Sequence, residues 1–76
     1  MQISFFSLVI PAYKQEKTIE RNIYEVEEVL KKIPYEYEII VVVDGLVDKT
    51  AQIVKRLKKT NKKIKLYENI INYGKG

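Results

Sequence analysis

The chain is 76 residues long, about half the usual length of one domain, so it forms at most one small domain or a piece of a larger one. Its hydrophobic share of 46% predicts a folded chain rather than a disordered one. It contains no Cys and no His, which excludes disulfide scaffolds, zinc fingers, thiol nucleophiles and His-based general bases.

The net charge of +4 is unevenly placed along the chain. Residues 1–38 hold five basic and seven acidic side chains, whereas residues 39–76 hold nine basic and three acidic ones. Most of the excess lies in segment 55–65 (KRLKKTNKKIK). Such a run indicates either a site for nucleic acid, anionic lipid or phosphate, or the solvated face of a helix. We favour the solvated face of a helix over a binding site, because Val54 and Leu57 keep an apolar stripe beside the charges and no aromatic residue lies among them.

The first predicted element is a strand over Phe5–Ile10 (FFSLVI), an apolar run typical of a strand buried on both faces, with Pro11 as its end. An amphipathic helix is expected over about 17–33, because apolar residues recur there at steps of three or four. Pro34 ends this helix, since the residue before a proline is pushed out of the helical conformation.

The second half repeats this order. Segment 38–43 (EIIVVV) predicts another buried strand, which runs directly into Asp44-Gly45. A second helix is expected over about 49–60, with Asp48 at its N-cap. Its expected buried face consists of Ala51, Ile53, Val54 and Leu57. The alternation of apolar and polar residues over 63–67 predicts a third strand.

The order β-α-β-α-β implies an α/β fold, a parallel half-sheet of the Rossmann-like type with right-handed crossovers. Two helices can hardly cover both faces of three such strands. Segment 72–76 (NYGKG) is a loop sequence that normally leads into a further element. The chain is therefore expected to be an N-terminal fragment of a larger α/β protein.

Ligands of open α/β sheets bind beyond the carboxyl ends of the strands. Tyr13 follows the first strand and offers a ring on which a base could stack; Asp44 follows the second and offers a carboxylate for a base or ribose hydrogen bond. The alternative is that Tyr13 is an ordinary aromatic residue of a loop and that Asp44-Gly45 is a plain turn, with no ligand bound by either. Asp44 and Asp48 could together hold a divalent cation, but two carboxylates alone are few ligands for one. Asp48 is expected to cap the second helix instead.

The segments SLVIPAY (7–13), YEIIVVVDG (37–45), DKT (48–50) and NYGKG (72–76), in this order and spacing, resemble the start of a family 2 glycosyltransferase with the GT-A fold. The resemblance spans essentially the whole chain, so residues 1–76 are expected to be a partial domain, its nucleotide-sugar-binding segment. The stretch KIPYEYEII (32–40) is most similar to the branch of dolichyl-phosphate mannose synthases and other polyprenyl-phosphate glycosyltransferases.

The resemblance implies transfer of a sugar, with inversion, from a UDP- or GDP-sugar to an acceptor, a polyprenyl phosphate among the candidates. It places Pro11, Ala12 and Tyr13 in the base pocket, together with Asp44 and Gly45 after the second strand.

The resemblance also implies a donor-site loop formed by Gly74, Lys75 and Gly76. It assigns no catalytic residue and no metal ligand to this chain, because the Asp-x-Asp that holds Mg²⁺ or Mn²⁺ and the carboxylate base belong to later parts of the fold. The 76-residue chain alone is therefore not expected to transfer sugar.

Two positions near the expected pocket depart from the family pattern. The family commonly has Asp-Asp-Gly-Ser after the second strand, whereas this chain has Val43 and Leu46 at the first and last of these positions. Lys14 stands where Asn commonly follows the Tyr of the first strand.

Two further function classes stay open. One is a non-catalytic βαβαβ module that associates with another copy through its uncovered sheet face, and the other is a small basic nucleic-acid binder, although no nucleic-acid partner is expected. The apolar runs are far shorter than the roughly 20 residues of a membrane helix, and no signal-peptide pattern is present. A cytoplasmic location is expected, with the full-length parent at the cytoplasmic membrane surface.

Overall fold

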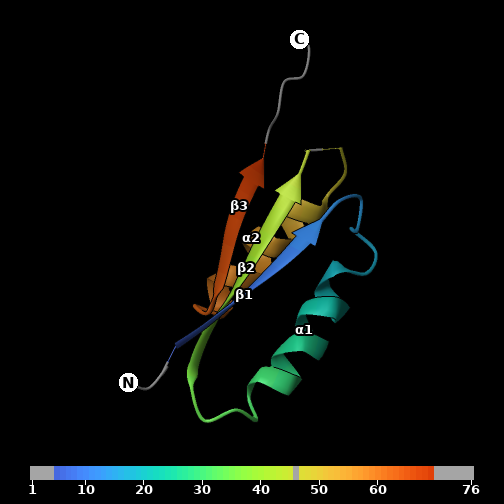
Figure 1. Ribbon diagram of the computed structural model, residues 1–76. Helices are drawn as coiled ribbons and strands as arrows, with labels where there is room; N and C mark the ends of the chain where they lie inside the picture. The colour runs from blue at the N-terminus through green and yellow to red at the C-terminus, as the bar shows by residue number, and fades with distance from the viewer. Residues whose placement is uncertain (1–4, 46, 70–76) are drawn as a thin grey trace.

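The computed structural model describes residues 5–45 and 47–69, which form a three-stranded sheet and two helices. In chain order the elements are β1 (Phe5–Ala12), α1 (Ile19–Leu30), β2 (Glu36–Asp44), α2 (Thr50–Thr60) and β3 (Ile64–Asn69). The strands lie parallel, in the order β1-β2-β3 (Figure 1). The predicted βαβαβ half-sheet of the Rossmann-like type is confirmed.

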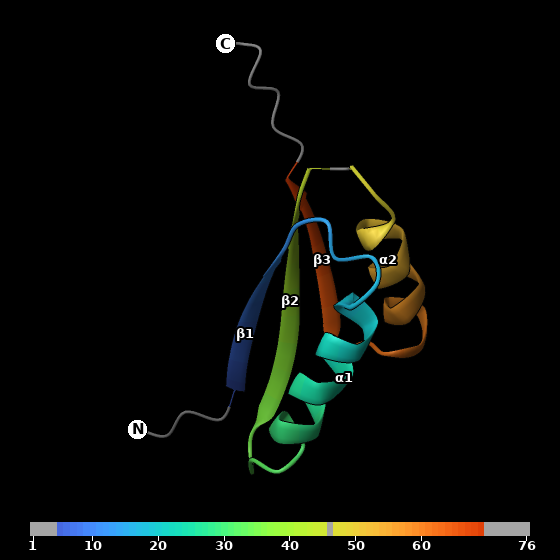
Figure 2. The same cartoon turned by 90° about the vertical axis from the view of Figure 1, so that its right-hand side faces the viewer.

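Both helices cover the same face of the sheet (Figure 2). The chain moves across the sheet in one direction, from β1 to β2 to β3, and crossovers of the same hand then place their helices on the same side. Along β2, Tyr37, Ile39, Val41 and Val43 are buried toward the helices, whereas the residues between them are half-buried. The expectation of strands buried on both faces was therefore wrong for the described residues, because two helices form only one covering layer.

The core lies between the helices and the covered face of the sheet. Both helices contribute an apolar stripe, as their sequence periods predicted, although Ile53 of α2 is only half-buried. Each fully buried aliphatic side chain stabilises the fold by about 1.5–3 kcal/mol relative to an exposed one. The buried apolar residues are Ala12, Ile19, Ile23, Leu30, Tyr37, Ile39, Val41, Val43, Ala51, Val54, Leu57 and Ile64.

Strand β1 runs through Pro11 and ends at Ala12, so the prediction that Pro11 ends the strand was wrong. In the described sheet β1 pairs with β2 alone. An edge strand leaves half of its N–H groups without a neighbouring strand, and a proline is tolerated at such a position. The longer strand carries Tyr13 to the same edge of the sheet as the end of β2.

Helix α1 is shorter at both ends than the pattern predicted. Before it, the N–H groups of Thr18 and Ile19 both donate to the carbonyl of Gln15, at 3.0 and 2.8 Å, which forms a turn rather than regular helix. After it, two N–H groups bond to carbonyls three residues back and close a tighter final turn before Pro34.

Glu27 connects α1 to the sheet and to the end of α2. The hydroxyl of Tyr37 donates to its Oε2 at 2.9 Å, and the amide of Asn61 donates to both of its oxygens at 2.9 and 3.0 Å. Burial and the neighbouring Glu27 carboxylate raise the pKa of Tyr37 to about 12, so the phenol remains a donor at neutral pH. These bonds hold the layers together near the start of β2, at the end of the sheet opposite Tyr13.

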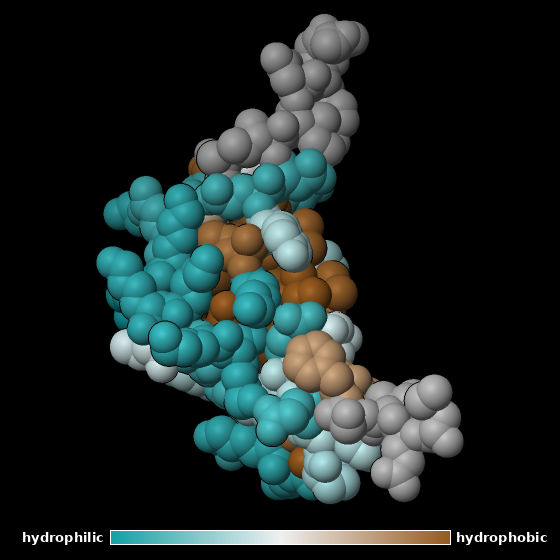
Figure 3. Space-filling view, turned by 90° about the vertical axis from the view of Figure 1, so that its left-hand side faces the viewer, coloured by the Kyte–Doolittle hydropathy of each residue, from teal (hydrophilic) through white to brown (hydrophobic). Residues whose placement is uncertain are grey.

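The second face of the sheet has no covering layer among residues 5–45 and 47–69. On this open face, Val9 and Tyr67 are 56% and 60% exposed, and Ile40 lies between their strands. Figure 3 shows hydrophobic residues that reach the surface beside a broad hydrophilic region. Self-association through this face stays a prediction.

Candidate functional site at the strand-end edge

The ends of β1 and β2 bring together the two groups that were predicted to share a ligand. Ala12 pairs with Val43, so Tyr13 and Asp44 leave the sheet at the same level. The Cε1 atom of the Tyr13 ring lies 3.9 Å from the position that a Cβ would take at Gly45. The aromatic ring therefore lies against the turn that follows Asp44.

Both groups are accessible to a ligand. Tyr13 is 55% exposed, and Asp44 is exposed at the last position of β2. The hydrogen bonds formed within the described part of the chain leave the carboxylate of Asp44 without a donor. A carboxylate of this kind can accept N–H or O–H bonds from a bound molecule without losing any from its own chain.

Gly45 shapes the turn between Asp44 and the next loop. Its φ of +84° lies in the left-handed region, which glycine adopts without the steric cost of a Cβ. The nearest side-chain atoms, from Tyr13 and Val47, lie at ordinary contact distance from a Cβ at this position. The backbone conformation rather than the available space therefore requires glycine, and its N–H donates to the carbonyl of Asn69 at 3.1 Å.

Lys14 has a φ of 52°, the left-handed conformation that Asn adopts more readily than Lys. Its Nζ lies 5.4 Å from the centroid of the Tyr13 ring, a cation–π contact. Lys14 therefore adds a positive charge beside the ring.

The two other predicted pocket residues lie on opposite faces of β1. Pro11 is exposed, on the open face of the sheet opposite Val42. Ala12 is only 2% exposed, and its methyl group belongs to the core. Any contact of Ala12 with a ligand would therefore come from its main chain.

Hydrogen bonds join the loop after β1 to the loop after β2. The N–H of Gln15 donates to Thr50 Oγ1 at 2.9 Å, and the N–H of Glu16 donates to Asp48 Oδ2 at 3.3 Å. In the reverse direction, the N–H of Lys49 donates to Glu16 Oε1 at 2.8 Å. We call Gln15, Glu16, Asp48 and Thr50 the loop lock, because their hydrogen bonds connect the loop that follows Tyr13 to the loop that follows Asp44.

Asp48 stabilises the start of α2, although not from the predicted N-cap position. The helix begins at Thr50 with Lys49 at the N-cap, one residue later than expected. Asp48 Oδ1 accepts bonds from the hydroxyl and the N–H of the fully buried Thr50, at 2.6 and 2.9 Å. The pKa of Asp48 is held below its ordinary value of 3.8, chiefly by the bond from the Thr50 hydroxyl. The N–H groups of Thr50 and Glu16 and the nearby Lys14 ammonium act in the same direction, whereas burial opposes them.

Sequence reasoning missed most of the loop lock. Gln15 and Glu16 carried no predicted role, because their partners lie 32 to 35 residues away and no local pattern connects them. The segment DKT (48–50) belonged to the resemblance, and that was the available signal for Asp48 and Thr50.

The described residues do not fit a divalent cation. Within residues 5–45 and 47–69 no group of three or more His, Cys, Asp or Glu side chains is arranged to hold a metal ion. Both carboxylate oxygens of Asp48 already accept bonds from the loop lock. We therefore assign no chemical step to a metal in this part of the chain.

Some predicted positions lie outside the described residues: Gly74, Lys75, Gly76 and Leu46. Val43, in contrast, is buried in the core, where an apolar side chain fits its surroundings. In the described part of the chain neither helix is long and apolar enough to cross a membrane.

Comparison with known proteins identifies the family. The model of the family described as "Glycosyl transferase family 2" matches residues 7–76. The chain belongs to glycosyl transferase family 2. This family assignment agrees with the resemblance found in the sequence and with the half-sheet of the structure.

Several curated glycosyltransferases are similar to this family 2 chain. A dolichyl-phosphate beta-glucosyltransferase of Trichomonas vaginalis is 35% identical over 77 residues, which cover 95% of this chain and 24% of the relative. An uncharacterized glycosyltransferase of Synechocystis is 38% identical over 69 residues, covering 91% of this chain and 22% of the relative. An undecaprenyl-phosphate 4-deoxy-4-formamido-L-arabinose transferase of Pseudomonas fluorescens is 35% identical over 52 residues, covering 68% and 15%.

The chain thus spans about a quarter of the length of the first two of these relatives. No solved structure matches it.

Proposed function

We propose that this chain is the nucleotide-binding segment of an inverting glycosyltransferase that uses a UDP- or GDP-sugar as donor. The observation that carries the proposal is that the exposed Tyr13 ring lies close to the Asp44-Gly45 turn at the strand-end edge of a family 2 chain. The base stacks on Tyr13, and Asp44 accepts a hydrogen bond from the base or the ribose.

Lys14 extends this proposal to the phosphates of the donor. Its ammonium lies beside the Tyr13 ring and close enough to Asp48 to lower the pKa of that carboxyl. A cation at this position can attract the diphosphate of a nucleotide whose base stacks on the ring. Lys14 would then take over a binding role at a position where the family commonly has Asn.

The expected affinity is low. Base–aromatic stacking is worth about 1–3 kcal/mol. A hydrogen bond to a charged group is worth about 1.5–3 kcal/mol. Together these terms correspond to a dissociation constant on the order of 1 mM. Binding must therefore be measured at millimolar nucleotide.

We further propose a polyprenyl phosphate as the acceptor of the full-length parent protein. The support comes from the printed names of two relatives, one a dolichyl-phosphate and the other an undecaprenyl-phosphate transferase. The parent would act at the cytoplasmic membrane surface and bind Mg²⁺ or Mn²⁺ through residues other than the described ones. We expect the purified 76-residue chain to release no sugar from any nucleotide sugar, and detectable turnover would contradict this.

The experiment is a calorimetric titration of the chain with UDP, GDP and random duplex DNA. Asp44→Asn is the test variant, and Glu36→Gln is its matched control, because Glu36 is an exposed carboxylate at the other end of β2. The proposal predicts binding of UDP or GDP that Asp44→Asn abolishes and Glu36→Gln leaves unchanged. A circular dichroism melt of each variant establishes that it is folded.

Two outcomes would support the alternatives. No binding of either nucleotide by the folded chain would favour a non-catalytic interaction module. Binding of duplex DNA that weakens steeply with salt would favour a nucleic-acid binder, because such binding depends on counterion release.

A further inference from the structure

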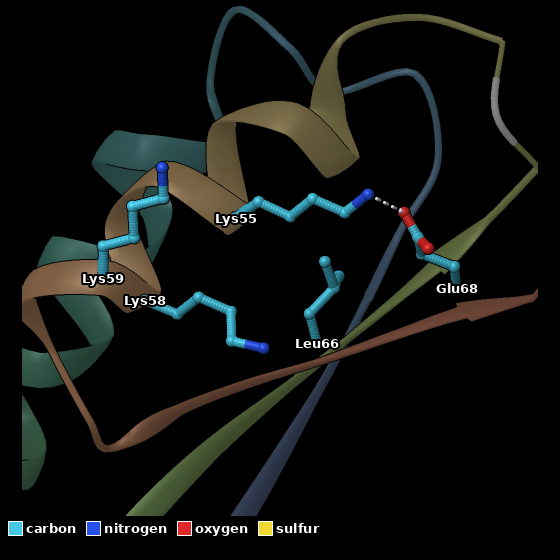
Figure 4. Close-up of a pocket in the computed structure, with 5 residues that line it drawn as sticks. All are labelled: Lys55, Lys58, Lys59, Leu66 and Glu68. Atoms are coloured by element: carbon cyan, nitrogen blue, oxygen red, sulfur yellow. Dashed lines mark ion pairs between the residues drawn. The ribbon is translucent and has the colours of Figure 1, made fainter.

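A hollow of about 460 Å³ lies between α2 and β3. Figure 4 shows the residues that line it, which we call the lysine groove: Lys55, Lys58, Lys59, Leu66 and Glu68. The lysine groove shares no residue with the strand-end edge or the loop lock, and neither the family assignment nor the proposed nucleotide site explains it.

Lys55 lies three residues before Lys58 and four before Lys59, so it is a neighbour of each of them on the surface of α2. Lys55 Nζ pairs with Glu68 Oε2 at 3.1 Å. Within the described residues, Lys58 and Lys59 have no carboxylate partner. The ion pairs of the described residues therefore leave the charges of Lys58 and Lys59 without a balancing carboxylate.

The floor of the groove is apolar. Leu66 is half-buried between the lysines of α2 and the rest of β3. In Figure 4 the side chain of Lys58 extends toward Leu66, whereas that of Lys59 points away from it. The groove thus has an apolar floor beneath lysine side chains whose ammonium groups lie outermost, so a negatively charged surface would meet the ammonium groups first.

We propose that the lysine groove docks the chain on an anionic lipid bilayer. The ammonium groups of Lys58 and Lys59 bind lipid phosphates, while Leu66 remains behind them at the floor of the groove. Docking gives both of these lysines a partner of opposite charge, because each ammonium group lies against a lipid headgroup. The inference does not depend on nucleotide binding.

The arrangement favours a bilayer over a single free phosphate. The lysines come from the middle and the last turn of α2, away from the unpaired N–H groups at a helix start that hold compact anions. Flexible lysines spread along a helix face suit a plane of charges that several of them can contact at once. A nucleic acid fits less well, because no aromatic side chain lines the groove for a base to stack on.

The test is co-sedimentation of the 76-residue chain with vesicles of phosphatidylcholine alone or with phosphatidylglycerol added. The variant Lys58→Gln/Lys59→Gln removes two charges from the groove. The matched control, Lys31→Gln/Lys32→Gln, removes two charges from an exposed lysine pair just after α1. Both doublets are exposed, and circular dichroism melts verify that each variant is folded.

We expect binding to the anionic vesicles, weakening at high salt, and none to the neutral ones. A lysine near an anionic surface contributes about 1 kcal/mol, or about 5-fold, so the groove variant should lose about 25-fold in partition coefficient. The control should lose far less. Acetylation footprinting of the unmodified chain gives a second readout, in which vesicles protect Lys58 and Lys59 but not Lys31 and Lys32.

Four results would overturn the proposal. The first is absence of binding to anionic vesicles. An equal loss in both double variants would mean that net charge alone acts. Displacement from vesicles by inorganic phosphate at constant ionic strength would mean that the groove binds free phosphate, and preferential, lysine-dependent capture by duplex DNA would mean that the surface binds nucleic acid.

Discussion

Two aspartates four residues apart, Asp44 at the end of β2 and Asp48 in the loop that follows it, have opposite surroundings. Asp48 uses both carboxylate oxygens to accept bonds from Thr50 and from the N–H of Glu16. Asp44 is exposed, and its carboxylate receives no donor from the described part of the chain. The two residues have the same side chain and the same charge but not the same role.

The difference teaches how to separate a structural carboxylate from a binding one. A carboxylate whose acceptor sites are filled by its own chain stabilises the fold and has little capacity left for a ligand. An unpaired carboxylate at a strand end gives the fold little and remains available to a ligand. By this criterion Asp48 holds the loops, and Asp44 is the residue that a nucleotide would contact.

The largest expected effect comes from Asp48→Asn. The substitution removes the charge and turns one acceptor oxygen into a donor, so it weakens bonds to Thr50 and Glu16. Hydrogen bonds to a charged acceptor are stronger than those to a neutral one, so we expect a lower free energy of unfolding. For a chain of this size the melting temperature at pH 7 should fall by about 10 °C.

The pH dependence of the same variant sharpens this prediction. The folded state lowers the pKa of Asp48 below 3.8, so its stabilisation is complete above that value and is lost as the pH falls through the lower folded pKa. The difference in melting temperature between the unmodified chain and Asp48→Asn should therefore shrink below pH 3.8. A difference that stays constant down to pH 2 would contradict the assigned role.

Tyr13→Ala should have the next largest effect, and on binding rather than on stability. Loss of the stacking ring should weaken UDP or GDP binding about 10-fold. Tyr13→Phe serves as the control, because it keeps the ring and removes the hydroxyl. If calorimetry finds the same loss for both variants, the hydroxyl and not the ring binds the ligand.

Lys14→Asn should have the smallest effect of the three substitutions, and it should raise stability rather than lower it. Asn tolerates the left-handed conformation at position 14 better than Lys, so we expect a gain of about 0.5 kcal/mol, or about 3 °C in the melt. Nucleotide affinity should fall a few-fold because the ammonium is lost. Lys17→Asn, in the turn before α1, is the control and should show neither change.

The fold was largely predictable from local patterns. The β-branched run of β2 and the apolar periods of both helices identified the elements and their order, although α1 ends at Leu30, before the limit that Pro34 sets. The sequence did not show that both helices cover the same face of the sheet, because this depends on whether the two crossovers proceed in the same direction across it. Pro11 was placed outside β1, since its tolerance depends on that strand being an edge.

The candidate site was predictable only in part. Tyr13 and Asp44 follow strands whose ends meet in any parallel sheet, so their proximity could be inferred. The loop lock could not, because the bonds of Gln15 and Glu16 to the second loop depend on three-dimensional closure of segments more than 30 residues apart. The left-handed conformation of Lys14 likewise follows from the path of the loop and not from the residue itself.

The most direct test measures Asp44→Asn and Asp48→Asn side by side, by thermal melting and by calorimetry with millimolar UDP and GDP. We predict that Asp44→Asn melts within about 0.5 kcal/mol of the unmodified chain and loses nucleotide binding. Asp48→Asn should melt about 10 °C lower and, at a temperature where it is folded, still bind. Unchanged nucleotide binding by a folded Asp44→Asn variant would contradict the central claim that this carboxylate contacts the donor.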